Sequence, residues 1–234
     1  MPSGRARRRR LNSIGPDRRR TVAEARDAAD RLAQQLGSSL TAPGNGGVFR
    51  AILTLLAEGA PVPKVAVARS LGRLDEDAAG LLAQIPSLEF DDAGDIVGAG
   101  LSLRPTAHLL EIGGRRLYTW CALDTLIFPA MLGRSARVTS PCAATGTPVR
   151  LVVGPEEIDE LDPASAVVSL HLFEGTRDVR SAFCRDVNFF VSEDSAAEWL
   201  HTHPDGWVLP VARGHSLARD LASQLANGVG PTCC

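Results

Sequence analysis

A cysteine and an aspartate stand three positions apart in an otherwise apolar segment, Trp120-Cys-Ala-Leu-Asp124-Thr-Leu. If the segment is helical from about Cys121, the thiol of Cys121 and the carboxyl group of Asp124 lie on one face. Burying a carboxylate beside a thiol costs free energy unless it has a purpose, so a chemical use is one interpretation, although an arbitrary Cys-x-x-Asp is more often structural. The alternative is a buried structural cysteine followed by an aspartate that caps the helix.

Two further cysteines lie in separate segments. Cys184 comes just before a strongly apolar strand, and Cys142 lies in the turn-rich run Ser140-Pro-Cys-Ala-Ala-Thr-Gly146. None of these cysteines has the Cys-x-x-Cys spacing of a zinc site, so the sequence does not indicate structural zinc. The pair His201-x-His203 has the residue types of metal ligands, but its polar surroundings predict a surface loop.

Three blocks of the sequence together resemble the bacterial organomercurial lyases, also called alkylmercury lyases. The blocks are Trp120-Cys-Ala-Leu-Asp124-Thr-Leu, Pro141-Cys-Ala-Ala-Thr-Gly146 and Arg180-Ser-Ala-Phe-Cys184. The resemblance runs in order from about residue 45 to residue 226 and is densest from Leu117 to Phe190. It implies protonolysis of the carbon–mercury bond of alkyl- and arylmercury compounds, which gives a hydrocarbon and Hg(II) in mercury detoxification and resistance.

The resemblance also implies roles for individual residues. The catalytic set of the family falls on Cys121, Asp124 and Cys184, which would also bind the mercury of substrate and product. Cys142 takes the place of a cysteine that is considered structural. Some members follow the distal cysteine with another cysteine, whereas this chain has Arg185, outside the catalytic set. No cofactor is implied: Hg(II) is a bound product, small cellular thiols release it, and a mercuric reductase is the implied acceptor.

The chemistry of mercury explains why such a set would work. Mercury is a soft cation that thiolates select, and two thiolates push electron density onto the bound carbon, which then accepts a proton more readily. The aspartate would take a thiol proton and deliver it to that carbon, but the sequence does not indicate which cysteine attacks first. Apolar neighbours that could shelter the alkyl or aryl group also suit simple core packing; they are Trp120, Leu123, Phe183 and Phe189.

Two other functions remain compatible with the sequence. A thiol-based metal sensor would regulate transcription through the N-terminal part of the chain, and a mercury-trapping carrier would bind the organomercurial without releasing hydrocarbon. Asp124 favours the enzyme, because a carboxylate is a hard oxygen donor that a soft-metal sensor does not need.

The residues that precede the first block predict a helical module. We expect helices over about 21–37, 48–59, 64–70 and 75–85, followed by a hairpin of strands over 88–90 and 95–97. This order resembles a winged helix-turn-helix and predicts a winged-helix-like N-terminal domain over residues 21–104. The acidic run Leu74-Asp-Glu-Asp-Ala78 argues against DNA as a partner, because phosphate contacts need Arg or Lys.

Residues 105–228 predict a mixed α/β catalytic domain, so the fold class expected for the whole chain is α+β. Runs with the length and pattern of strands alternate with helical runs in this half. The strands are expected over 108–112, 117–120, 136–139, 149–153, 166–172 and 187–191, and the helices from Cys121 (interrupted at Pro129), over 195–202 and over 216–226.

The two ends of the chain differ from the rest. Residues 1–20 hold eight arginines and one aspartate, which predicts a disordered tail, with a weak contact to polyanions as the alternative. Residues 229–234 are expected to form a flexible end, and a relay role for Cys233-Cys234 stays open, as does the oligomeric state. The sequence has no apolar run that suits a membrane span or a signal peptide, so a cytoplasmic location with reduced cysteines is expected.

Overall fold

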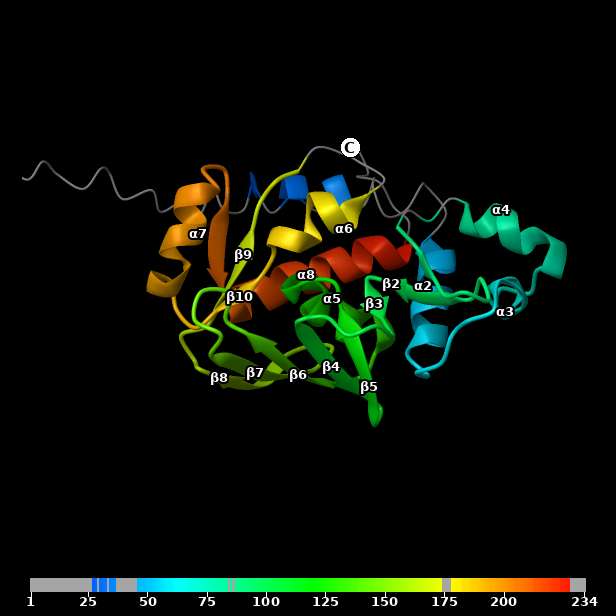
Figure 1. Cartoon of the computed structure of the whole chain (residues 1–234), viewed down its shortest axis with the longest axis horizontal. Helices are drawn as coiled ribbons and strands as arrows, with labels where there is room; N and C mark the ends of the chain where they lie inside the picture. Colours follow the sequence, from blue (N-terminus) through cyan, green and yellow to red (C-terminus); the bar gives the residue numbers. More distant parts are fainter. Residues whose placement is uncertain are drawn as a thin grey trace, which may run out of the picture.

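The computed structural model describes residues 27–36 apart from 29 and 33, residues 46–173 apart from 84 and 86, and residues 178–227. The predictions for the arginine-rich segment 1–20 and for Cys233-Cys234 lie outside the described residues. The fold combines helices with two antiparallel sheets (Figure 1), which confirms the predicted α+β class.

The N-terminal part is helical, as predicted. Described residues of the stretch 27–36 are helical, and the following elements are α2 (Gly46–Leu56), α3 (Lys64–Ser70), the short 3-10 helix η1 (Asp75–Asp77) and α4 (Ala78–Leu82). Helix α2 buries the side chains of Val48, Phe49, Ile52, Leu53 and Leu56, which recur at helical spacing on one face. This buried face fixes the N-terminal helices against the rest of the protein.

A hairpin joins these helices to the larger sheet. Strands β1 (Glu89–Phe90) and β2 (Ile96–Ala99) pair antiparallel, and the carboxylate of Asp91 accepts the backbone N–H groups of Ala93 and Asp95 within the turn. Strand β3 (Leu101–Ser102) then pairs with both β2 and β5. The hairpin is therefore an extension of the main sheet, and the sheet crosses the expected boundary near residue 104.

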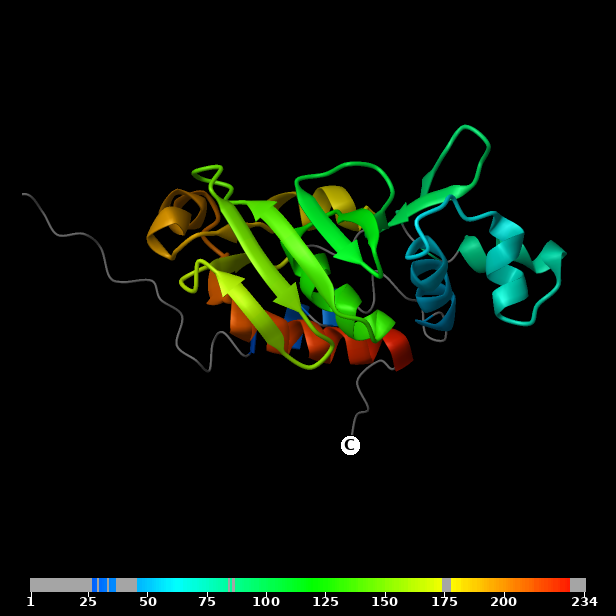
Figure 2. The same cartoon turned by 90° about the horizontal axis from the view of Figure 1, so that it is seen from below.

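The main sheet has eight strands in the order β1-β2-β3-β5-β4-β6-β7-β8, and all of its pairings are antiparallel. The remaining strands are β4 (His108–Ile112), β5 (Arg115–Thr119), β6 (Ala136–Pro141), β7 (Pro148–Val153) and β8 (Ile158–Asp162). Buried and exposed residues alternate along β6 and β7, as they do in a sheet with one face on the core. Figure 2 shows this sheet lying across the two central helices, which are described next.

Two helices form the centre of the molecule. Helix α5 (Ala122–Leu132) is buried on almost every side, and α8 (Val211–Asn227) packs along it (Figures 1 and 2). Pro129 was expected to interrupt the first of these helices, but α5 continues through it and ends at Gly133, whose φ is +63°. Pro129 removes one helical hydrogen bond and crowds the preceding turn, but three further residues still complete the helix before a left-handed glycine stops it.

A second sheet lies beside the N-terminal end of α8 (Figure 1). It has the order β10-β9-β11 and consists of β9 (Val167–Leu170), β10 (Phe189–Phe190) and β11 (Trp207–Pro210). The connecting helices are α6 (Val179–Ala182), η2 (Cys184–Asp186), η3 (Asp194–Ala196) and α7 (Ala197–Thr202). Among the described residues, no helix is long and apolar enough to cross a membrane.

Candidate active site

The turn from β5 into α5 places Cys121 and Asp124. Backbone N–H of Trp120 donates to the carbonyl of Gly100, and the hydroxyl of Thr119 donates to the carbonyl of Cys121. Cys121 is the N-cap of α5, and its N–H donates to the carboxylate of Asp124 at 3.2 Å. The helix-cap alternative is thus correct as a description of the backbone, and the cap itself brings the carboxyl group next to the thiol.

Cys184 reaches the same place from a distant part of the chain. It is the first residue of η2, just after α6, whose N-terminus is capped by the carboxylate of Asp178 accepting the N–H of Ser181. The N–H of Ala122 donates to the carbonyl of Val187, which ties this segment to the start of α5. Long-range backbone pairing therefore brings Cys184 to Cys121.

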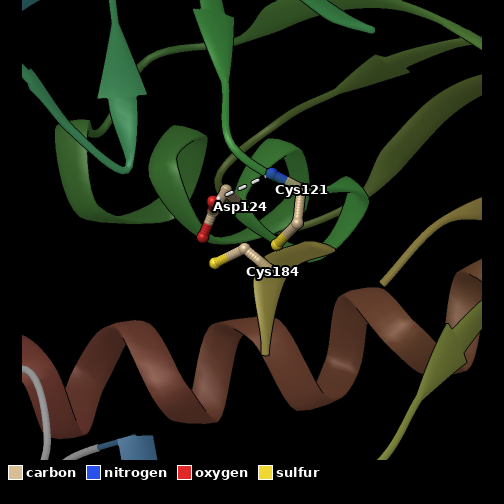
Figure 3. Close-up of side chains that lie close together, drawn as sticks. All are labelled: Cys121, Asp124 and Cys184. Carbon is tan, nitrogen blue, oxygen red and sulfur yellow. Dashed lines mark hydrogen bonds between the residues drawn. The ribbon is translucent and has the colours of Figure 1, made fainter. Parts of the chain in front are cut away.

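Figure 3 shows the two sulfur atoms and the carboxylate of Asp124 converging on one point. One ligand atom from each of Cys121, Asp124 and Cys184 lies within 4.8 Å of the other two. Cys121 is fully buried, Cys184 is 5% exposed and Asp124 is half-buried. We call these three residues the catalytic trio, after the role that the sequence resemblance predicts for them.

Burial controls the protonation of the catalytic trio. It raises the pKa of Asp124 to about 7, against the opposing effect of hydrogen bonds from Cys121 and from the backbone of Trp120. Burial also raises the pKa of Cys121 well above its ordinary value, and the hydrogen bond with Cys184 adds to this. For Cys184 the hydrogen bond with Cys121 favours the thiolate, but burial and the charge of Asp124 outweigh it and its pKa is raised. Near neutral pH, Asp124 can therefore both accept and release a proton.

The raised pKa of Asp124 predicts a cost in stability at alkaline pH. A folded-state pKa of about 7 lies above the ordinary 3.8, so the favourable contribution is complete below 3.8 and is lost as the pH rises through 7. Relative to wild type, Asp124→Asn should gain roughly 2 kcal/mol of unfolding free energy between about pH 5.5 and about pH 9. Urea unfolding at both pH values measures this; an equal difference at both would contradict the buried, titrating carboxyl group.

A mostly apolar pocket adjoins the catalytic trio. Among the residues proposed from the sequence, Trp120, Leu123 and Phe183 line it, together with Asp124 and Cys184. Phe189, which the sequence also suggested, does not line this pocket. It belongs to β10, pairs with Val168 and is fully buried in the core. The lining also includes residues that sequence reasoning did not propose, among them Phe49 of α2, Gly100 and Phe128.

Sequence reasoning missed a charged contact beside the pocket. The guanidinium of Arg180 lies over the ring of Trp120, 5.2 Å from its centroid, and forms an ion pair with Glu89 of β1. The positive charge of Arg180 also favours the thiolate of Cys184, although it does not outweigh burial. Glu89 and Arg180 are 91 positions apart, and no local sequence signal links them.

Cys142 lies apart from the catalytic trio. It is 1% exposed and packs with Val167, Phe190 and Ala196 in a second, smaller core cluster. Burial opposes its ionisation, but hydrogen bonds from Thr145 and from backbone N–H groups outweigh burial and lower its pKa. The structural role implied for Cys142 stays a prediction.

The fold and the trio define a class of protein: one that can bind a soft metal through two thiols and move a proton at the same point. Comparison with known families gives the particular one. The family model described as "Alkylmercury lyase" matches residues 101–223. The model described as "Helix-turn-helix domain of alkylmercury lyase" matches residues 27–100. This chain belongs to the alkylmercury lyase family.

Named relatives agree with this assignment. The chain is 46% identical over 214 residues to an alkylmercury lyase of Streptomyces lividans. The matched region covers 88% of this chain and 100% of the relative. It is 45% identical to one of Staphylococcus epidermidis, over 80% of this chain and 88% of the relative. A crystal structure of the mercury-bound form of MerB2 has a similar fold, with a TM-score of 0.71, 24% identity, and coverage of 85% of this chain and 99% of that one.

Proposed function

We propose that this chain is an organomercurial lyase that cleaves the carbon–mercury bond of alkyl- and arylmercury compounds by protonolysis. The observation that carries the proposal is the convergence of Cys121, Asp124 and Cys184 within 4.8 Å at a largely buried point. Two soft thiolate ligands and one proton carrier are the groups that this reaction needs. No metal or organic cofactor enters the proposal.

The reaction can be written so that each proton has a place. One thiol binds R–Hg⁺ as its thiolate, and its proton leaves with the displaced ligand of the substrate. Ionised Asp124 then accepts the proton of the other thiol, which becomes the second thiolate on mercury. The carbon takes the proton from Asp124 as the carbon–mercury bond breaks. The hydrocarbon R–H leaves, and Hg(II) remains bound by Cys121 and Cys184 with Asp124 beside it.

The surroundings of the trio fit this sequence of steps. The apolar pocket formed in part by Trp120, Leu123 and Phe183 suits an alkyl or aryl group and excludes water from the carbon that is to be protonated. A mercury ion held by two thiolates needs competing thiols to leave, so we propose small cellular thiols and a mercuric reductase as acceptors. With these partners, the proposed protein acts in the cytoplasm, in mercury detoxification and resistance.

We propose that the N-terminal helices and the β1–β2 hairpin form a winged-helix-like module that covers the site and does not bind DNA. Phe49 of α2 lines the pocket directly. Arg69 and Arg73 form ion pairs with Asp75 and Asp77, so these arginines are already neutralised within the module. Such a surface offers little attraction to phosphate groups.

The test is benzene release from phenylmercury in the presence of excess small thiol. We expect the wild type to form one benzene for each Hg(II), detected by gas chromatography. Cys142→Ser is the matched control, because it removes a buried thiol outside the trio, and it should retain most of the activity. Stoichiometric binding of phenylmercury without benzene would reject the lyase and favour a carrier or a sensor.

A further inference from the structure

The peptide group that leads into Cys184 lies between two short helical turns. Helix α6 has four residues and η2 has three, and Phe183 separates them with φ −128° and ψ −60°. The carbonyl oxygen of Phe183 accepts one backbone hydrogen bond, from the N–H of Asp186 at 3.2 Å, so a single short turn holds this peptide group from within the segment. Because a peptide group rotates as one rigid plane, its orientation sets the direction in which the side chain of Cys184 leaves the backbone.

His171 holds this peptide group from outside the segment. Its Nε2 lies 3.2 Å from the carbonyl oxygen of Phe183, and its Nδ1 lies 3.0 Å from the carbonyl oxygen of Leu172. The imidazole ring also contacts the ring of Phe183, with centroids 5.3 Å apart. His171 immediately follows β9, so the contact links the second sheet to the residue before Cys184.

The other end of the same turn is held in a similar way. The carbonyl oxygen of Asp186 accepts hydrogen bonds from the indole N–H of Trp199 at 3.0 Å and from the hydroxyl of Ser169 at 3.1 Å. The segment that bears Cys184 is thus fixed at Asp186 by side chains of α7 and β9. His171 is the side chain that supplies the corresponding hydrogen bond at Phe183.

We infer that His171 is a positioning residue that orients the thiol of Cys184 toward Cys121 and Asp124. The inference rests on the proposed function and adds a residue that has no place in its chemistry. Both atoms that face the imidazole are carbonyl oxygens, which only accept hydrogen bonds. Without His171, the N–H of Asp186 alone holds the carbonyl of Phe183, so the peptide plane can tilt and Cys184 moves away from the geometry that two-thiol coordination needs.

Two substitutions separate the hydrogen bond from the packing of the ring. His171→Phe keeps the contact with the ring of Phe183 but removes the donor. His171→Gln has a side-chain amide that can donate in place of Nε2. The matched control is His201→Phe, which replaces an exposed histidine of α7. Each protein is assayed for kcat and KM with phenylmercury and for Hg(II) affinity by competition with a small dithiol.

We expect His171→Phe to lower kcat by about 10- to 100-fold with little change in KM, since the apolar pocket is kept while the two-thiol geometry is lost. Its Hg(II) affinity should fall as well. His171→Gln should restore kcat to within about threefold of wild type, and His201→Phe should not differ from wild type. If His171 only stabilised the fold, His171→Phe would lower the melting temperature without a selective fall in kcat relative to KM.

Two results would overturn the inference. One is a His171→Phe variant with wild-type kcat and Hg(II) affinity; the other is a His171→Gln variant as impaired as His171→Phe. If His171→Phe does not fold, His171→Met takes its place, because it fills the site without a donor and is read in the same way. Failure of the wild type to release benzene would instead reject the lyase function, while the Hg(II) affinities would still decide the role of His171.

Discussion

Replacing either cysteine of the catalytic trio by serine should slow benzene release from phenylmercury by about a thousandfold or more. A serine hydroxyl is a hard and weakly acidic group, so it does not supply the second thiolate that makes the mercury-bound carbon accept a proton. Both Cys121→Ser and Cys184→Ser preserve side-chain volume at a buried position. Single-turnover assays with enzyme in excess measure the chemical step without product release.

The remaining thiol provides the control for this experiment. Each single variant should still bind phenylmercury through one thiolate, so binding persists while turnover is lost. Mass spectrometry of the unreacted adduct distinguishes these steps. If Cys184→Ser kept more than about a tenth of the wild-type rate, protonolysis would not require two thiolates and the proposed reaction would be wrong.

The second large effect is expected at Asp124. Asp124→Asn should lower the rate of benzene release by about 10²- to 10⁴-fold, the usual range for loss of a proton-transfer group. The amide oxygen can still accept the N–H of Cys121, which the carboxylate accepts at 3.2 Å, so the start of α5 should be preserved. Unchanged Hg(II) binding by the variant would show that the two thiols keep their positions.

The pH profile gives an independent view of the same residue. Because the free carboxylate must accept the proton of the second thiol, kcat/KM of the wild type should rise with pH through about 7, the raised pKa of Asp124. The residual activity of Asp124→Asn should lack this rise. A variant that keeps the rise would assign it to another group, and a rate within about tenfold of wild type would remove Asp124 from proton transfer.

The sequence was informative about the site because its chemistry depends on residue types. A carboxyl group is expensive to bury beside a thiol, which drew attention to Cys121 and Asp124, and the resemblance to a known family added Cys184 and the roles of all three before their distances were known. The pocket was less accessible, since apolar residues serve the core and a pocket equally well. Phe189 lies in the core, whereas Phe49 of the N-terminal helices lines the pocket without any local signal.

Residues that act through long-range contacts were not predictable from local sequence. The ion pair between Arg180 and Glu89 and the contact of His171 with Phe183 depend on how strands and helices pair in space. The fold shows the same division. Strands with alternating or continuous apolar residues, such as β6 and β9, were predicted, but β8 was missed because its sequence Ile-Asp-Glu-Leu-Asp is acidic and largely exposed.

The distance in sequence between Cys121 and Cys184 has a consequence beyond catalysis. Sixty-two residues lie between them, a span that runs from α5 through strands of both sheets. An ion that bridges both sulfurs closes this span into a covalent-like loop, and such a cross-link removes conformational freedom from the unfolded chain. The product-loaded protein should then resist unfolding better than the empty one. Removal of the ion by an external thiol would break this cross-link. Each round of turnover therefore ends with the loss of a stabilisation that the reaction itself produced.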